Sequence, residues 1–417
     1  MLTDDGLQDL ENYFVFSLAP LLNAYFAALA TEASSLADET SDQPTIFFIS
    51  REGQFLSRAF TAFCEARGLS LRSRPLIASR TLLMKMVFSD AIGELSAGLS
   101  YHGSVSGFFS DRLSITSGQL ERIGVSPAIA AGQLSLPADA DWLAHILANH
   151  APGLGDFLKG RREAYTAYLK ESGYFDGPGL IADVGYSGTI QKLLHRLTGR
   201  NCAGFYCIGS DALTSPQSNF DGRRKALFER QGRFGDGNPF LDSTLIFEVL
   251  MSADYGQVDD ITPTATAPGY RFEFGAKSRS QHLFPLLALG QEAVCRELGA
   301  CGDISLDDLL SDDFKENVRV LLLTLLTNRQ LAPVMIQQIA EVDDRMGGEG
   351  FINPWTLLPP LRKKVETGSL RLNFIAFMKT ETGSEVCSCE RTSFYRRKSP
   401  SAQRFDEYAH IDGTFVV

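Results

Sequence analysis

The pattern of apolar positions changes period several times within the first seventy residues. Residues 7–34 carry apolar side chains at helical spacing with Pro20 inside the run, which predicts a kinked helix or two helices. The polar stretch 38–44 predicts a loop, and residues 45–50 form the short continuous apolar run that is typical of a buried parallel strand. After Gly53 the helical period returns, so we expect a strand, a tight turn and a helix in succession.

The same order recurs later in the chain. Residues 76–79, 179–183 and 203–208 predict a second, third and fourth strand. A helix with apolar residues at i, i+3, i+4 and i+7 is expected over 190–197. Because strands that alternate with helices pair in parallel through right-handed crossovers, the sequence predicts an open, mainly parallel, Rossmann-like α/β sheet.

Three regions follow from this pattern. Residues 1–44 are expected to form an N-terminal helical segment. Residues 45–260 would form an α/β core that contains a helical insertion at about 82–175 and, near its end, a helix over 240–253. Residues 261–417 are expected to form a mostly helical C-terminal region.

Composition narrows the classes of partner. The 417 residues are 44% apolar and 21% charged, an ordinary balance for a globular protein. The 39 basic and 50 acidic residues give a net charge of −11, which argues against a nucleic-acid backbone as partner but leaves room for a local basic site.

The N-terminus, the apolar runs and the cysteines bear on location. The N-terminus lacks the basic start of a signal peptide, and apolar runs such as 320–326 are shorter than the roughly 20 residues that span a bilayer. Seven scattered cysteines indicate a reducing compartment, and the Cys387-x-Cys389 pair lacks the partners of a zinc site. We therefore expect a cytoplasmic protein that is not integral to a membrane, with the inner membrane face as an alternative place of action.

The loop after the third strand is the stronger of two candidate ligand sites. Ligands bind at the carboxyl ends of parallel strands, and Asp183 ends this strand. Ser187, Gly188 and Thr189 follow at the start of a helix, where free backbone N–H groups and hydroxyls suit a phosphate. Asp183 would then hold sugar hydroxyls. The alternative is that Ser187 only caps the helix and Asp183 is an ordinary polar residue at a strand end.

The second candidate loop follows the first strand. Arg51 precedes Glu52 and Gly53, and a planar guanidinium suits the paired oxygens of a diphosphate. Ser79 and Arg80, after the second strand, would bring another guanidinium to the same edge of the sheet. The alternative is an Arg51 that only pairs with Glu52.

Both loops resemble those of type I phosphoribosyltransferases, which use phosphoribosyl pyrophosphate (PRPP). In the PRPP loop of that family an apolar strand is followed by two acidic residues, about two variable residues and then Thr-Gly. Asp183, Ser187 and Gly188 match the second acid, the hydroxyl and the glycine, and Ala182 stands where the first acid usually is. Residues 46–53 resemble the pyrophosphate loop, with Glu52 in place of the first glycine of Arg-Gly-Gly.

A closer resemblance covers most of the first 260 residues or so. Residues 18–22, 47–53 and 183–191 resemble a bacterial group from polysaccharide gene clusters, often labelled haloacid-dehalogenase-like because many members carry such a phosphatase domain. Glu248 and the nearby 252–253 also fit this group. The resemblance implies a pentosyltransferase that moves ribofuranose 5-phosphate from PRPP to a glycan of O-antigen or capsule type, after which a separate phosphatase removes the phosphate.

The resemblance also implies roles for individual residues. Asp183 would hold the ribose and Mg²⁺, and Glu248 would be the general base, with Asp211 and Asp254 as alternatives. The expected catalytic residues are Arg51, Asp183 and Glu248. The expected substrate-binding residues are Ser50, Arg51, Glu52, Gly53, Ser79, Arg80, Gly185, Tyr186, Ser187, Gly188, Thr189 and Gln191.

Other functions stay open at this point. A non-catalytic phosphosugar-binding module is favoured by Ala182, and a partner domain of a haloacid-dehalogenase-like phosphatase is a related option. A phosphatase itself would need a second Asp two residues after Asp183, where Gly185 stands. A transferase using a sugar nucleotide would want an Asp-x-Asp site, and the pairs 259–260 and 312–313 lack that spacing.

The six histidines form no catalytic pattern, and the C-terminal region offers one surface for the acceptor. Apolar and then basic residues follow each other there, in 394–398 and in the set Trp355, Pro359, Pro360, Arg362, Lys363 and Lys364. They would suit either a lipid-linked glycan acceptor or a solvated charged face.

Overall fold

We describe the fold from a computed structural model. It describes residues 4–97, 100–210, 213, 220, 222–229, 241, 244–327, 329–343, 350–356, 395–397 and 408–410.

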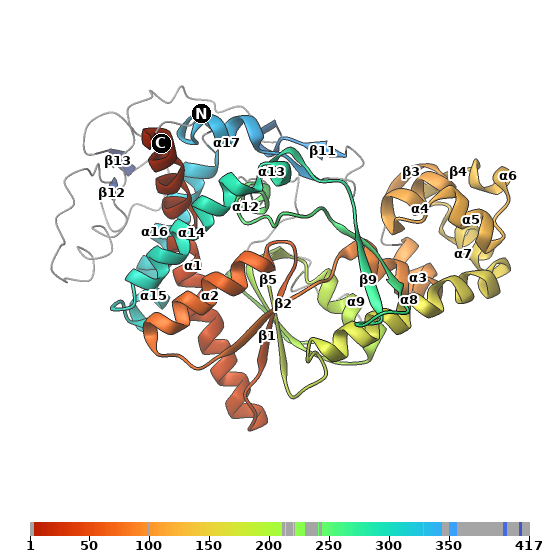
Figure 1. The fold of residues 1–417 in the computed structure, drawn as a ribbon, viewed down its shortest axis with the longest axis horizontal. Coiled ribbons are helices and arrows are strands. Elements are labelled where there is room, and N and C mark those ends of the chain that lie inside the picture. The colour runs from red at the N-terminus through yellow and green to blue at the C-terminus, as the bar shows by residue number, and fades with distance from the viewer. Residues whose placement is uncertain are drawn as a thin grey trace.

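A five-stranded parallel sheet forms the centre of the molecule (Figure 1), with the strand order β2-β1-β5-β6-β7. Its strands are β1 (Thr45–Ile49), β2 (Arg72–Leu76), β5 (Gly179–Tyr186), β6 (Ala203–Gly209) and β7 (Arg224–Glu229). The predicted open parallel α/β sheet is therefore confirmed, with β5 as its central strand.

The two edge strands differ from the sequence prediction. β2 ends at Leu76, so the strand predicted at 76–79 lies about four residues too late, and β7 was not predicted. Both edge strands pair on one side only, and β2 alternates between exposed and half-buried positions instead of forming an apolar run. The apolar-run signal therefore marked only the strands that are buried on both faces.

Helices cover both faces of the sheet, and β1 shows this residue by residue. Ile46 and Phe48 pack into one core, and Phe47 and Ile49 pack into a second core on the other face. The first core includes side chains of α1 (Asp4–Thr40) and α2 (Gly53–Arg67), and the second includes side chains of α3 (Arg80–Ala97) and α9 (Thr189–Thr198). β1 thus contributes alternate side chains to two layers.

The long helix α1 runs through Pro20 without a second start, so the alternative of two helices is wrong. An 18-residue window of this helix has a mean hydropathy of 1.6 and is 78% buried, and in length and composition α1 could cross a membrane. Short uninterrupted apolar runs therefore did not exclude a segment of this length: the helix predicted over 7–34 has polar residues among its apolar ones and still has the length and mean hydropathy of a membrane span. In the structure its apolar side chains pack against α2, α14 (Phe284–Ala300) and α16 (Asp312–Thr327).

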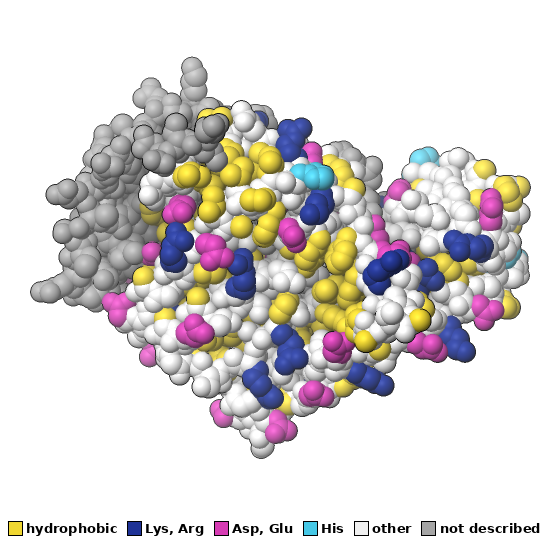
Figure 2. Space-filling model, in the orientation of Figure 1, with side chains coloured by type: hydrophobic (Ala, Val, Ile, Leu, Met, Phe, Trp, Pro, Cys, Tyr) yellow, Lys and Arg dark blue, Asp and Glu magenta, His cyan; other side chains and the backbone are white. Residues whose placement is uncertain are grey.

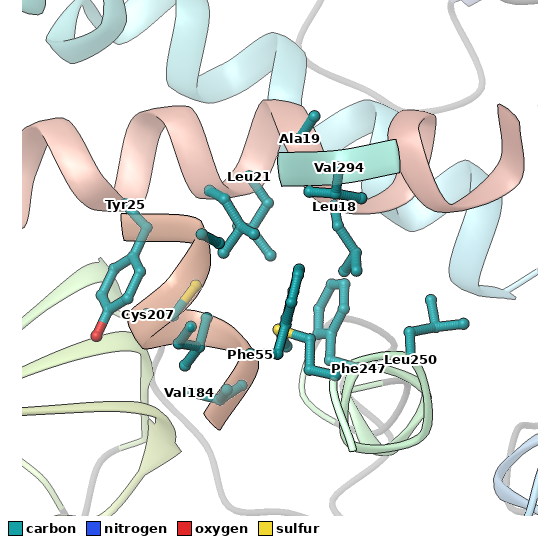
Figure 3. Close-up of a cluster of buried hydrophobic side chains, with 14 of the residues drawn as sticks. Leu18, Ala19, Leu21, Tyr25, Phe55, Val184, Cys207, Phe247, Leu250 and Val294 are labelled. Atoms are coloured by element: carbon teal, nitrogen blue, oxygen red, sulfur yellow. The ribbon is translucent and has the colours of Figure 1, made fainter. Parts of the chain in front are cut away.

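Figure 3 shows part of this packing. Leu18 and Leu21 of α1 lie near Phe55 of α2, and Tyr25 extends from α1 towards the strands. The Tyr25 hydroxyl reaches the carbonyl oxygens of Asp183 and Phe205, at 3.2 and 3.0 Å. The N-terminal helix therefore hydrogen-bonds to the backbone of β5 and β6 as well as covering these strands.

The segment between β2 and β5 is mostly helical, but it contains an unpredicted antiparallel pair of strands, β3 (Tyr101–Ser104) and β4 (Gln133–Leu136). With α4–α7 this strand pair forms the lobe on the right of Figure 1. The helices after α3 are α4 (Val105–Leu113), α5 (Ser117–Ile123), α6 (Pro127–Ala130), α7 (Ala140–Asn149) and α8 (Ala151–Glu171).

The helix predicted over 240–253 corresponds to α12 (Leu245–Leu250), which ends three residues earlier; residues 240, 242 and 243 lie outside the described residues. An unpredicted antiparallel hairpin follows, β8 (Val258–Pro263) and β9 (Tyr270–Phe274), and β8 packs on α3 and α8. The remaining described elements are mainly helices: α13 (Arg279–His282), α14, α15 (Leu306–Leu310), α16, η1 (Arg329–Leu331), α17 (Val334–Ile339), β10 (Val342–Asp343), β11 (Phe351–Ile352), η2 (Pro354–Thr356), β12 (Tyr395–Arg397) and β13 (Tyr408–His410).

A buried ion triad joins the β8–β9 hairpin to α3 and α8. The Lys85 ammonium lies 3.1 Å from the Asp260 carboxylate, and Arg161 Nε lies 3.0 Å from both oxygens of the same group. The Lys85 side chain is fully buried and the Asp260 side chain is 5% exposed. Because Asp260 is engaged in this way, the 259–260 acid pair serves the fold.

Candidate functional site

Five charged residues meet where the central strands end, and we call them the charged cluster: Arg51, Glu52, Arg80, Asp183 and Glu248. Arg51 Nη2 lies 3.5 Å from Glu248 Oε2, although the two residues are 197 positions apart. Arg51 Nε lies 3.9 Å from Glu52 Oε1. The charges of Glu52, Glu248 and Arg80 all act on Asp183. The structure thus brings together both predicted loops, the start of α3 and the helix α12.

Asp183 stands on the central strand, and its pKa is raised well above the ordinary range. Burial by the surrounding protein is the main cause, and the negative charges of Glu52 and Glu248 add to it. The Val184 N–H, which donates to Asp183 Oδ1 at 2.8 Å, and the positive charge of Arg80 oppose the shift. The neutral carboxyl is therefore favoured, and in that form Asp183 can donate a hydrogen bond as well as accept one.

The two arginines of the cluster differ in exposure. The Arg51 side chain is only 15% exposed, and its contacts with carboxylates are longer than the 2.7–3.2 Å or so of a well-formed hydrogen bond. Arg80 is exposed, yet surrounding protein lowers its pKa by desolvation, while Glu248 and Asp183 raise it. The Arg80 guanidinium nevertheless stays charged, because an arginine does not lose its proton in proteins.

The turn into α9 has the form expected of a phosphate-binding loop. Gly188 is the N-cap residue and adopts a φ of +67°, in the left-handed region that favours glycine. No side chain caps the helix through this residue, so the alternative of Ser187 as a plain N-cap is not what the structure shows. The Ser187 and Thr189 hydroxyls lie 2.8 Å apart.

Two basic residues beside this turn, Arg224 and Lys192, were not predicted from the sequence. A Cβ on Gly188 would lie 3.3 Å from the Cδ of Arg224, so the Arg224 side chain runs alongside the turn. Burial lowers the pKa of Lys192, and the charge of Arg224 lowers it further. Arg224 belongs to the unpredicted strand β7, whereas Lys192 could have been found from its place one turn into α9.

Ser79 and Ser50, two of the predicted ligand residues, make hydrogen bonds within the fold. The Ser79 hydroxyl donates to the Val258 carbonyl at 2.5 Å and accepts from the Leu82 N–H at 3.0 Å. The Ser50 hydroxyl contacts both the N–H and the carbonyl of Ala78 at 3.3 Å. Ser79 therefore caps α3, and Ser50 ties the end of β1 to the segment after β2.

Gln191, also predicted to bind substrate, is buried inside the fold. Its amide nitrogen donates to the carbonyls of Cys202 and Arg223 at 2.7 and 3.2 Å, and its oxygen accepts from the Tyr206 hydroxyl at 2.8 Å. Both ends of the side chain thus connect α9 to the sheet.

The glycines and Tyr186 shape the two loops. A Cβ on Gly53 would lie 2.3 Å from the Phe48 carbonyl oxygen, so glycine is required for α2 to begin against β1. A Cβ on Gly185 would lie 3.0 Å from the Ile208 carbonyl oxygen. Burial, and then the charge of Glu248, raises the pKa of Tyr186. One non-proline cis peptide occurs in each loop, before Arg51 and before Tyr186.

The other predicted positions are distributed more widely. Asp254 is exposed in the loop after α12, and Asp211 lies outside the described residues. Trp355 is buried in the first core. The C-terminal positions that lie outside the described residues are Pro359, Pro360, Arg362, Lys363, Lys364, Cys387, Cys389, Phe394 and Lys398.

Possible metal ligands and the surface charges add no further side chains to this site. Within the described part of the chain, no group of three or more His, Cys, Asp or Glu side chains is placed to hold a metal ion. On the face that Figure 2 shows, acidic and basic side chains of the described residues are interspersed. The sequence matches no protein-family model and no curated protein.

Proposed function

We propose that this protein is a PRPP-dependent pentosyltransferase that moves ribofuranose 5-phosphate to a sugar hydroxyl of a bacterial surface polysaccharide and releases pyrophosphate. The observation that carries the proposal is the placement of cations on either side of β5. Arg51 and Arg80 follow the carboxyl ends of β1 and β2 on one side, and on the other side Arg224, the first residue of β7, reaches the Gly188 turn with its side chain. A ligand with a phosphate at each end and a polyol between them fits this order.

Each group would have a defined task. Arg51 and Arg80 bind the diphosphate, whose negative charge grows as the bond to C1 of the ribose breaks. The backbone N–H groups that open α9, with Ser187 and Lys192 beside them, hold the 5-phosphate. Asp183 hydrogen-bonds the ribose hydroxyls. Fixing both ends of the donor in this way supplies orientation, which is a large part of the rate in such reactions.

Mg²⁺ is expected to accompany the donor. This ion commonly binds through one or two carboxylates together with substrate phosphates, so a full set of protein ligands is not required. Asp183 is the group that we expect to hold it, and its carboxyl would release its proton as the ion binds. When bound, Mg²⁺ neutralises charge on the diphosphate.

Glu248 is the proposed general base. Its carboxylate lies beside Arg51 in the charged cluster, whereas the alternative Asp254 is exposed in the following loop. Taking the proton of a sugar hydroxyl that attacks opposite the diphosphate would give a β-linked ribofuranosyl 5-phosphate. A separate phosphatase would then remove the phosphate, and a lipid-linked acceptor would place the reaction at the inner membrane face.

A non-catalytic phosphosugar-binding module is the second candidate. Ala182 favours it, because this residue is fully buried in the first core and supplies no acid where related transferase loops have one.

The activity test is a transfer assay. Protein, PRPP labelled in the ribose and Mg²⁺ are incubated with the lipid-linked glycan fraction of a bacterium whose polysaccharide contains ribofuranose. We expect label in the glycan with wild type and with Asp156→Asn, which changes an exposed carboxylate on α8, and none with Asp183→Asn. Donor binding without transfer by wild type would favour the binding module.

A further inference from the structure

Glu52 is a buried carboxylate whose surroundings leave one oxygen without a hydrogen-bond donor. The residue is 8% exposed, and its Oε1 accepts no hydrogen bond from any residue that the structure describes. The cation nearest to this oxygen is Arg51 Nε, at 3.9 Å, beyond the reach of a hydrogen bond. A buried acceptor in this state costs stability, so it marks a position where a ligand can supply what the protein does not.

A structural role does not account for the side chain. Glu52 is the N-cap residue of α2, but its backbone has helical angles, with φ −59° and ψ −30°, and its side chain makes no capping hydrogen bond. Its carboxylate lies close enough to Asp183 that its charge is the largest of the neighbouring charges acting on that residue. Two carboxyl groups therefore face one site on the central strand.

The missing partner is either a cation or a hydroxyl. Among the residues that the structure describes, no group of three metal-binding side chains exists here or elsewhere, so Mg²⁺ would bind here only together with the phosphates of a bound donor. Hydroxyl groups fit better, because each donates one hydrogen bond to a carboxylate and two neighbouring hydroxyls can serve two carboxyl groups. The matching ligand is a sugar with adjacent free hydroxyls.

We propose that Glu52 and Asp183 together bind the 2- and 3-hydroxyls of a ribo-configured furanose, and that Glu52 makes the site selective for ribose over 2-deoxyribose. This inference rests on the proposed function, in which Asp183 alone holds the sugar. The β1–α2 turn thus supplies the second acid that β5 lacks, since Ala182 points into the core.

The test compares two sugar phosphates, ribose 5-phosphate and 2-deoxyribose 5-phosphate, by calorimetric titration without divalent cations. A hydroxyl that bonds a charged acceptor contributes enough that wild type should prefer the ribose compound by roughly ten- to a hundredfold. Glu52→Gln keeps the size of the side chain but leaves only a neutral amide acceptor, so this preference should fall severalfold, with little change for the deoxy compound. Glu65→Gln, an exposed carboxylate on the same helix α2, should leave the preference unchanged.

The outcomes separate this inference from the proposed function. Wild-type protein that binds PRPP but does not distinguish the two sugar phosphates overturns only the role of Glu52. The same role is overturned if Glu52→Gln has a normal melting temperature and keeps the full wild-type preference for the ribose compound. Wild-type protein that binds no PRPP overturns the proposed function itself.

Discussion

The contact between Arg51 and Glu248 predicts the direction in which pyrophosphate affinity changes when Glu248 is replaced. In the absence of donor, the guanidinium proposed to bind the diphosphate lies 3.5 Å from the proposed base. A diphosphate must therefore compete with Glu248 for Arg51. We expect Glu248→Gln, which removes the competing charge and keeps the shape, to bind pyrophosphate more tightly than wild type, although it should abolish sugar transfer.

The structure bounds the size of this effect. The two side chains are 15% and 23% exposed, and Coulomb's law at an effective dielectric constant of about 20 gives roughly 4–5 kcal/mol at this distance. Solvent screening and desolvation remove most of that value, and measured pairs near a surface contribute about 0.2–1 kcal/mol. The affinity for pyrophosphate should therefore rise by up to about fivefold. Loss of the general base should lower the transfer rate by about 10²- to 10⁴-fold.

The assay is a calorimetric titration with magnesium pyrophosphate at two salt concentrations. Glu292→Gln is the matched control, because it breaks another Arg–Glu pair, with Arg58, whose side chains are about half exposed and lie outside the site. We expect the control to bind as wild type does, and the gain in Glu248→Gln to shrink at high salt. Weaker pyrophosphate binding by Glu248→Gln would refute the reasoning, because it would mean that Glu248 holds Arg51 in place for the ligand.

Three further predictions concern pH, the ion triad and the two phosphate sites. Because the pKa of Asp183 is raised, the folded state keeps a proton that the unfolded chain loses above about pH 4. The free energy of unfolding therefore falls as the pH rises from about 4 towards the raised pKa. Asp183→Asn should melt higher than wild type at pH 8 and equally near pH 4, and a lower melting temperature at pH 8 would contradict this. Asp260→Asn leaves Lys85 buried without its charge partner and should cost about 3–5 kcal/mol in denaturant unfolding; a loss below about 1 kcal/mol would contradict it. Arg51→Ala should weaken pyrophosphate binding more than ribose 5-phosphate binding and Arg224→Ala should do the reverse, as calorimetry would show; equal losses would contradict two separate sites.

The sequence predicts the interior of the sheet well and its edges poorly. β1, β5 and β6 are covered on both faces, so their residues form apolar runs that mark a strand. β2 and β7 lie at the edges, where side chains alternate between protein and solvent, and so the pattern placed one too late and missed the other. The β8–β9 hairpin was missed for a similar reason, since β9 is largely half-buried or exposed.

The candidate site was partly predictable for a chemical reason. Arg51 follows the end of β1 and Asp183 lies near the carboxyl end of β5, and this position alone points to ligand binding. β5 continues to Tyr186, so the prediction that Asp183 ends the strand placed that end three residues too early. Sequence cannot show whether a polar residue near such an end faces a ligand or the fold, and Gln191 proves to be engaged inside the protein. Nor can it show that Arg51 meets Glu248, because that contact joins residues far apart in the chain.

The central claim is that the edge of the sheet at Asp183 binds PRPP, and calorimetric titration with PRPP and Mg²⁺ tests it most directly. The account predicts saturable one-to-one binding by wild type, a clear loss of affinity in Asp183→Ala, and wild-type affinity in Asp156→Asn. Absence of binding by wild type across a range of Mg²⁺ concentrations, or equal binding by wild type and Asp183→Ala, would contradict it.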